Sequence, residues 1–249
     1  MGVNSLSWFY TPVLGRQGEE VSLDGDEWHH CYNVHRMQSG DSIILCDGKG
    51  QCFEGTIRST SAKSGRIELQ EDYSGMFRNP RSYRVSIGIA PTKNMDKTEF
   101  AVEKLVEMGV EEICFLDTRH GERTYLRMDR IQKIIIAASK QSRKINFPSL
   151  SSLQTPKEYI SLKQGDEKAV QILVCHLDEN SLSLSENYLP GKDVVVLIGP
   201  EGGFSNEEVE WMKNEGGKSV HLGPFRLRVE TAAIVACAGI HLLNQMHSK

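Results

Sequence analysis

The sequence predicts an α/β protein in which a small β-barrel precedes a larger domain with a mainly parallel sheet. Short β-type runs separated by tight turns fill the first 74 residues, and strands alternate with helices beyond residue 82. One strand of the second part is apolar throughout, as expected where helices cover both faces of a parallel sheet. We therefore expect two domains, at residues 1–74 and 75–249.

In the first part, short runs of β-forming residues alternate with turn residues. The expected strands are Ile43–Cys46, Cys52–Ile57 and Ile67–Leu69, with an Asp47-Gly48-Lys49-Gly50 turn between the first two. A helix over about Asp26–Met37 interrupts these strands, and Asp24 or Asp26 is its expected N-cap.

Beyond the polar stretch at residues 78–81, the spacing of apolar residues predicts an alternation of strands and helices. The expected strands are Tyr83–Ala90, Glu112–Leu116, Val170–His176, Val194–Ile198 and Ser219–Leu222. The expected helices are Asp96–Met108, Asp129–Lys144, Pro156–Leu162, Ser205–Glu215 and Val229–Met246.

Composition excludes several classes of protein. The 249 residues, 39% of them hydrophobic, suffice for a folded core and exclude disorder as the main state. The longest apolar run, Ala232–Leu243, is shorter than the roughly 20 residues of a membrane span, and the N-terminus lacks a leader pattern. The six cysteines have neither zinc-site nor disulfide-framework spacing. We expect a cytoplasmic protein with no membrane partner and no metal.

Charge is balanced overall but concentrated locally. The formal net charge is −4, so no general attraction to nucleic acid or anionic membranes is expected. Residues 119–144, however, hold eight basic side chains against two acidic ones. Such a segment is typical of a phosphate-binding surface, although a solvated helix face is an equally good interpretation at this stage.

A possible ligand site follows the apolar strand Val194–Ile198, which runs into Gly199-Pro200-Glu201-Gly202-Gly203-Phe204. Ligands of open α/β sheets bind at the carboxyl ends of strands. Ser205 and Glu208 form a capping-box pattern that opens a helix, so Gly202 and Gly203 are left as bare backbone that a ligand can approach. An ordinary strand-to-helix turn is the alternative.

A second glycine-bearing strand end, Val220–Pro224, leads into the last helix. Arg226 and Arg228 alternate, so both can project to one side of an extended segment. An ion pair between Arg228 and Glu230 is the structural alternative. Two such strand ends form the natural wall of one pocket, and neither the dinucleotide fingerprint nor the P-loop pattern occurs.

The ordered set of these motifs resembles the small-subunit ribosomal RNA uridine-N3 methyltransferases, the RsmE family of the SPOUT superfamily. The likeness covers almost the whole chain. Its pieces are residues 198–204, 222–223 and 227–232, together with 107–110, Glu122-Arg123, 132–134 and 140–142, and in the first part His30, Val34-His35-Arg36, Gly40-Asp41 and Asp47-Gly48. Departures from the family pattern are His35, Phe225 and Arg143-Lys144.

The resemblance implies a PUA-like β-barrel followed by a SPOUT-type α/β domain with a C-terminal trefoil knot, and it implies a homodimer. S-adenosylmethionine is the implied cofactor. The residues expected to hold it are His176, Ile198, Gly199, Pro200, Glu201, Gly202, Leu222, Gly223, Leu227, Arg228, Thr231 and Ala232.

The expected reaction is methylation of N3 of a uridine in 16S ribosomal RNA, with an assembled small subunit as substrate. We expect Arg228 to stabilise the charge on the base and Glu230 to act as general base or to orient Arg228. RNA is expected to contact Arg36, Lys93, Asn94, Lys97, Arg123, Lys140, Arg143 and Lys144. The alternatives are a noncatalytic RNA-binding or ribosome-assembly protein and a methyltransferase acting on another RNA position.

Overall fold

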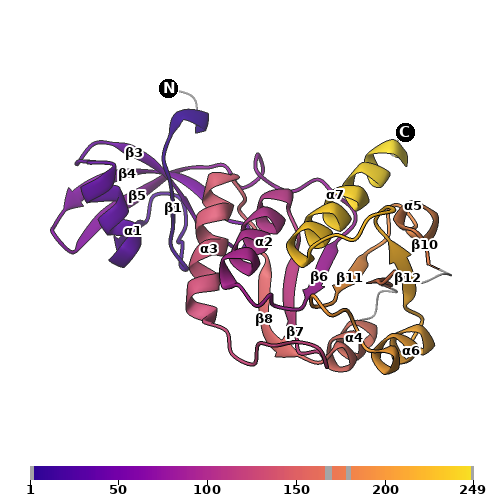
Figure 1. Ribbon diagram of the computed structural model, residues 1–249. Helices are drawn as coiled ribbons and strands as arrows, with labels where there is room; N and C mark the ends of the chain where they lie inside the picture. Colours follow the sequence, from indigo (N-terminus) through magenta and orange to yellow (C-terminus); the bar gives the residue numbers. More distant parts are fainter. Residues whose placement is uncertain (1–2, 166–169, 178–180, 248–249) are drawn as a thin grey trace. The chain divides into compact units, whose positions relative to one another are not determined.

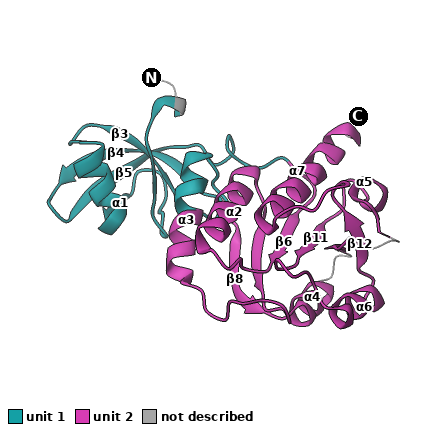
Figure 2. Cartoon of the chain, viewed as in Figure 1, with its two compact units in different colours: residues 1–80, 136–147 teal, residues 81–135, 148–249 magenta. Residues whose placement is uncertain are grey.

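The computed structural model describes residues 3–165, 170–177 and 181–247 and divides the chain into two compact units (Figure 2). Unit 1 comprises residues 1–80 and 136–147, and unit 2 comprises residues 81–135 and 148–249. Unit 1 is thus discontinuous in sequence, because residues 136–147 come from the part of the chain that the sequence assigns to the second domain. The limits 1–74 and 75–249 stay our prediction for the domains.

A curled five-stranded sheet forms the framework of unit 1, as expected for a PUA-like barrel (Figure 1). Its order is β1-β3-β4-β5-β2, with β1 and β3 parallel and the other neighbours antiparallel. Strands β1 and β2 were not predicted, because the first is too short to show alternation and the second is a largely exposed, polar edge strand. The bounds are β1 Trp8–Tyr10, β2 Glu20–Asp24, β3 Ser42–Cys46, β4 Cys52–Thr60 and β5 Ser64–Asp72.

The helix expected over Asp26–Met37 consists of two shorter segments, α1 at Gly25–His29 and a π-helical segment at His30–Val34. Asp24 is the N-cap residue, but its side chain makes no capping hydrogen bond. The segment is anchored by Trp28 instead, whose buried indole donates from Nε1 to the Ser61 carbonyl at 2.9 Å. Burial of this indole therefore holds the helical insertion on the sheet.

A parallel sheet of seven strands forms the centre of unit 2, in the order β10-β12-β9-β11-β6-β7-β8. The predicted strand β11 is confirmed and is buried at every residue. Strands β8 and β10 were not predicted, because β8 is a polar sequence at the sheet edge and β10 has only two residues. The bounds are β6 Val85–Ile89, β7 Glu112–Leu116, β8 Ser149–Gln154, β9 Gln171–Cys175, β10 Leu182–Ser183, β11 Val194–Ile198 and β12 Lys218–His221.

Helices connect these strands, and local sequence sets several of their ends. Asn94 caps α2 by accepting from the Asp96 amide at 3.0 Å, and Gly109 ends that helix in the left-handed region at φ +89°. The described helices of this part of the chain are α2 Met95–Met108, α3 Met128–Gln141, α4 Pro156–Gly165, α5 Leu184–Asn187, α6 Asn206–Asn214 and α7 Val229–His247. Helix α3 begins in unit 2 and ends in unit 1.

The helix expected over Val229–Met246 is confirmed as α7, which extends beyond both ends of the apolar run Ala232–Leu243. It has 19 residues and contains an 18-residue window with a mean hydropathy of 1.2, so it is long and apolar enough to cross a membrane by length and composition alone. The buried residues Ala233, Ala236 and Ile240 face the interior of unit 2, where α7 packs against α2, β6 and β11. This packing is typical of a core helix of an α/β domain. The trefoil knot stays a prediction.

Gly217 lets the chain turn back from α6 into β12. Its amide donates to the Met212 carbonyl at 2.8 Å, and a Cβ at this position would lie only 2.7 Å from that oxygen. Because the obstructing atom belongs to the backbone, we expect Gly217→Ala to lower the free energy of unfolding by about 1–3 kcal/mol in urea titrations. Gly165→Ala is the matched control, since a Cβ there meets nothing within 4 Å. Equal unfolding midpoints for the two variants would contradict this expectation.

Candidate functional site

A cavity of about 580 Å³ opens in unit 2 at the carboxyl ends of β9, β11 and β12. The strand register brings these ends together, because Cys175 pairs with Ile198 on one side and with Val220 on the other. The carboxyl edge of a parallel sheet is where ligands of such folds bind. The described lining residues are Cys175, His176, Leu177, Ile198, Gly199, Pro200, Glu201, Gly202, Gly203, Val220, His221, Leu222, Gly223, Phe225, Arg226, Leu227, Arg228, Val229 and Ala232.

The glycine-rich loop after β11 forms one wall. A Cβ on Gly199 would lie 3.1 Å from the Phe204 ring, so this position suits a residue without a side chain. Gly203 has φ +74°, which also favours glycine. The predicted capping box is confirmed: the Ser205 hydroxyl accepts from the Glu208 amide at 3.3 Å, and the Glu208 carboxylate accepts from the Ser205 amide at 2.7 Å. The backbone amides of Ser205 and Glu208, at the start of α6, thus have side-chain partners. The glycine backbone lines the cavity.

The loop between β12 and α7 forms the opposite wall. Gly223 has φ +128°, and its amide donates to Nδ1 of His221 at 3.3 Å. Arg226 spans the two walls, since its Nη2 donates to the Glu201 carbonyl at 2.6 Å. A charge-assisted hydrogen bond of this kind is stronger than a neutral one. The two loops therefore form one connected rim around the cavity.

All residues expected to hold the cofactor line this cavity, except Thr231, which is exposed on α7. Eight further lining residues are outside that set, although the sequence had pointed to Gly203 as backbone open to a ligand and to Arg226 as a neighbour of Arg228. Cys175, Val220 and His221 could have been found from the rule that strand ends meet at one edge. Burial raises the pKa of the Cys175 thiol to about 12, so it lines the cavity as a neutral group. The other five are Leu177, Gly203, Phe225, Arg226 and Val229.

The two residues expected to carry the chemistry lie in different surroundings. Arg228 is exposed and lines the cavity. Glu230 is not among the described lining residues; its side chain is 12% exposed, and its Oε1 lies 4.0 Å from Nζ of Lys97 on α2. Glu230 thus lies beside Lys97 of α2, and its expected role as general base or in orienting Arg228 stays a prediction.

Basic residues of two neighbouring loops lie beside the glycine-rich wall. The Arg123 guanidinium donates to the Thr92 and Lys93 carbonyls at 3.1 and 2.6 Å, which ties the loop after β7 to the loop after β6. The Lys93 amide donates to Oε1 of Glu201 at 3.3 Å, and its Nζ lies 3.0 Å from Glu122. Two residues expected to contact RNA, Lys93 and Arg123, thus also organise the rim.

The remaining cations expected to bind RNA belong to unit 1. Lys140 has a structural position there, since its Nζ lies 2.5 Å from Oε1 of Glu27 and its side chain is only 13% exposed. Arg36 and Arg143 are exposed, and both have φ +56°. Lys144 is half-buried. The geometry favours Arg36 and Arg143 over Lys140 as contacts for a large anionic ligand.

The cavity suits a small organic ligand with both apolar and polar parts. Ligand pockets generally measure about 300–1,000 Å³ and are lined by apolar groups with a few placed polar ones. Ile198, Leu222 and Leu227 supply apolar surface here, and the glycine backbone and Arg228 supply polar groups. Within the described ranges, no three His, Cys, Asp or Glu side chains are grouped so that they could hold a metal ion.

Comparison with known proteins points to one family. A model described as an RNA methyltransferase domain matches residues 79–241, and one described as an RNA methyltransferase PUA domain matches residues 23–70. The chain is 28% identical over 230 residues to ribosomal RNA small subunit methyltransferase E of Rickettsia conorii, covering 92% of each protein. The Bacillus subtilis protein of the same name is 27% identical over 256 residues, covering 96% of this chain and 97% of the relative.

Solved structures agree with this grouping. A probable rRNA-methyltransferase from Porphyromonas gingivalis is 37% identical, with a TM-score of 0.87 over 97% of this chain and all of the other. The ribosomal RNA small subunit methyltransferase E from Neisseria gonorrhoeae, bound to S-adenosyl methionine, is 25% identical, with a TM-score of 0.82 over 96% of this chain and 98% of the other.

The link between Arg226 and Glu201 can be tested directly. Arg226→Ala removes the hydrogen bond that joins the two cavity walls, so we expect faster amide hydrogen exchange in residues 199–205 and 222–228 with an unchanged melting temperature. Arg84→Ala is the control, because Arg84 is an exposed arginine at the amino end of β6, away from the cavity. Unchanged exchange in both loops of the first variant would contradict the link.

Proposed function

Because the chain belongs to the RNA methyltransferase family, we propose that it transfers a methyl group from S-adenosylmethionine to N3 of a uridine in small-subunit ribosomal RNA. The observation that carries this proposal is the cavity at the ends of β9, β11 and β12, with Arg228 on its wall. Relatives that align along nearly the whole chain are named for methylation of that RNA, and a structural relative binds this cofactor. A ribosomal substrate is in keeping with a cytoplasmic location.

The residues present fit the proposed cofactor. The cavity volume of about 580 Å³ lies within the range of small-molecule sites. Ile198, Leu222 and Leu227 offer apolar surface for an adenine ring, and the backbone of Gly199 and Gly202 lines the cavity beside them. His176, Pro200, Glu201, Gly223, Arg228 and Ala232 complete the proposed binding set. Thr231 is left out, because it is not among the lining residues.

The proposed chemistry assigns one main task to this chain, which is to stabilise the substrate in its reactive form. When bound, S-adenosylmethionine supplies a methyl group on a sulfonium, and transfer requires alignment at close range. Uracil N3 must lose its proton to a water molecule, which leaves negative charge shared with the two flanking carbonyl oxygens. We assign stabilisation of this charge to the guanidinium of Arg228. Glu230 lies outside the lining and acts in this proposal as a positioning residue beside Lys97.

RNA binding is assigned to cations near the cavity and on unit 1. N3 lies on the Watson–Crick edge, so the target uridine must be unpaired or displaced from its helix. An assembled small subunit is the proposed substrate because it holds its RNA in one tertiary structure. Lys93, Asn94, Lys97 and Arg123 are proposed contacts on unit 2, and Arg36, Arg143 and Lys144 on unit 1.

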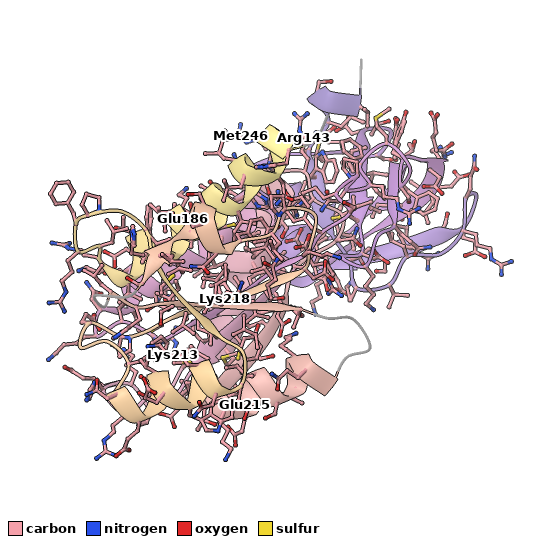
Figure 3. All side chains as sticks on the ribbon, turned by 90° about the vertical axis from the view of Figure 1, so that its right-hand side faces the viewer. Arg143, Glu186, Lys213, Glu215, Lys218 and Met246 are labelled. Carbon is pink, nitrogen blue, oxygen red and sulfur yellow. The ribbon has the colours of Figure 1, made fainter. Side chains whose placement is uncertain are left out.

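We also propose a homodimer with α7 in its interface. Val235, Leu242 and Met246 follow one another at intervals of seven and four residues, which places them on one face of the helix. All three are exposed apolar side chains, and Figure 3 shows Met246 near the free end of α7. A second copy of the chain would remove this stripe from water.

Incubation with labelled cofactor tests the proposed reaction. We expect the protein to transfer methyl groups to small ribosomal subunits that lack the modification, and nucleoside analysis to identify 3-methyluridine. A 2′-O-methylated product would favour the alternative of another RNA position. Failure to bind S-adenosylmethionine at high micromolar concentration would favour a noncatalytic RNA-binding or assembly protein.

The proposed role of Arg228 predicts that its removal lowers turnover more than it weakens cofactor binding. We expect Arg228→Ala to lower kcat roughly 100-fold, the usual effect of removing a group that stabilises developing negative charge. The Kd for S-adenosylmethionine, measured by calorimetry, should rise by a much smaller factor than kcat falls, and Arg228→Lys should recover part of the activity. Arg84→Ala should behave like the unaltered protein. An unchanged kcat in Arg228→Ala would remove Arg228 from the mechanism.

The proposed dimer predicts an effect of charge on α7. Leu242→Glu places a carboxylate in the apolar stripe, so we expect light scattering to give the mass of a single chain, 27.9 kDa, in place of twice that mass. Leu162→Glu makes the same substitution at an exposed leucine of α4, and it should leave the dimer intact. A dimer that survives Leu242→Glu would exclude this stripe as the contact.

A further inference from the structure

Phe225 stands out among the residues that line the cavity. At 81% exposure, it is the most exposed large apolar side chain of the described residues. It lies in the loop between β12 and α7, after Gly223 and Pro224 and immediately before the rim residue Arg226. An aromatic ring is thus held at the opening of the cavity with almost all of its surface in water.

The fold itself does not depend on this ring. Phe225 takes part in none of the aromatic pairs and hydrophobic clusters found among the described residues. Its loop is held by other groups: Arg226 bonds to Glu201, Gly223 bonds to His221, and Val229 is buried at the start of α7. Packing therefore does not explain a phenylalanine here.

The surroundings of the ring are those of a site for an unpaired base. Arg226 and Arg228 line the same cavity, and both residues are exposed. A flat aromatic surface flanked by cations is the arrangement with which proteins bind single-stranded nucleic acid, since the bases stack on the ring and the cations attract the phosphates.

We propose that Phe225 is the stacking surface for the displaced target uracil. The proposal rests on the proposed function and adds the residue that selects an unpaired base. With one face of the base on the ring, its N3 edge can turn into the cavity toward Arg228. The adenine of the cofactor and a second copy of the chain are other groups that could cover the ring, and the experiments below separate them from the base.

Binding measurements test the contact without any methyl transfer. The probes are a single-stranded oligouridylate and an abasic oligomer with the same number of phosphates. We expect Phe225→Ala to weaken binding of the oligouridylate roughly 5- to 150-fold, the range seen when an aromatic residue that stacks on one base is truncated. Binding of the abasic oligomer should not change, because its phosphates still meet the same cations.

Conservative variants separate stacking from simple apolar contact. Phe225→Tyr should bind the oligouridylate like the unaltered protein, whereas Phe225→Leu should bind it as weakly as Phe225→Ala. Phe100→Ala is the matched control, since Phe100 is 48% exposed on α2 and is not a lining residue. The Kd for S-adenosylmethionine and the oligomeric mass should be unchanged in every variant.

Each outcome supports or overturns the proposal. Full binding of oligouridylate by Phe225→Ala or Phe225→Leu overturns it. A weaker Kd for S-adenosylmethionine assigns the ring to the cofactor, and loss of the dimer assigns it to the partner chain, so either result also overturns it. Failure of the proposed function has a separate signature, because the unaltered protein would then make no 3-methyluridine whatever the binding data show.

Discussion

The site depends on the register of three parallel strands. Because Cys175 is level with both Ile198 and Val220, the strands β9, β11 and β12 end at nearly the same height, and the loops that leave them must lie side by side. Side chains of a strand alternate between the two faces of the sheet, so a slip of one residue would turn all side chains of a strand over. The cavity wall is thus set by the same pairing that builds the core.

Much of the fold could be predicted because its signals are local. A continuous apolar run identified β11, and the Ser205–Glu208 pattern identified the start of α6. Strands β1 and β8 were not predicted. β1 has only three residues, too few to show alternation of apolar and polar residues, and β8 is a polar edge strand that pairs with β7 alone. The π-helical turn after α1 was also not predicted; its buried residue is Cys31.

For the candidate site, the sequence predicted the cavity wall better than the positions of the charged side chains. Glycine-bearing strand ends identified most of the cavity wall, whereas the position of a long side chain depends on partners far away in the sequence. Glu230 pairs with Lys97 across two helices, and Lys140 pairs with Glu27, so neither is as available as its position in the sequence suggested. Arg123 was expected to contact RNA, but its guanidinium donates hydrogen bonds to two backbone carbonyls. Cations near the rim therefore divide between shaping the site and attracting a polyanion.

The return of residues 136–147 to unit 1 has a consequence for how the protein can be divided. Ile145 packs in one cluster with Ile44, Cys46 and Cys52, and Lys140 neutralises the poorly solvated carboxylate of Glu27. A fragment ending at residue 80 would lack both and would leave an apolar gap beside an unbalanced charge. The small unit is therefore not one continuous segment of the chain, and a gene fusion that transplanted residues 1–80 alone would leave part of its core behind.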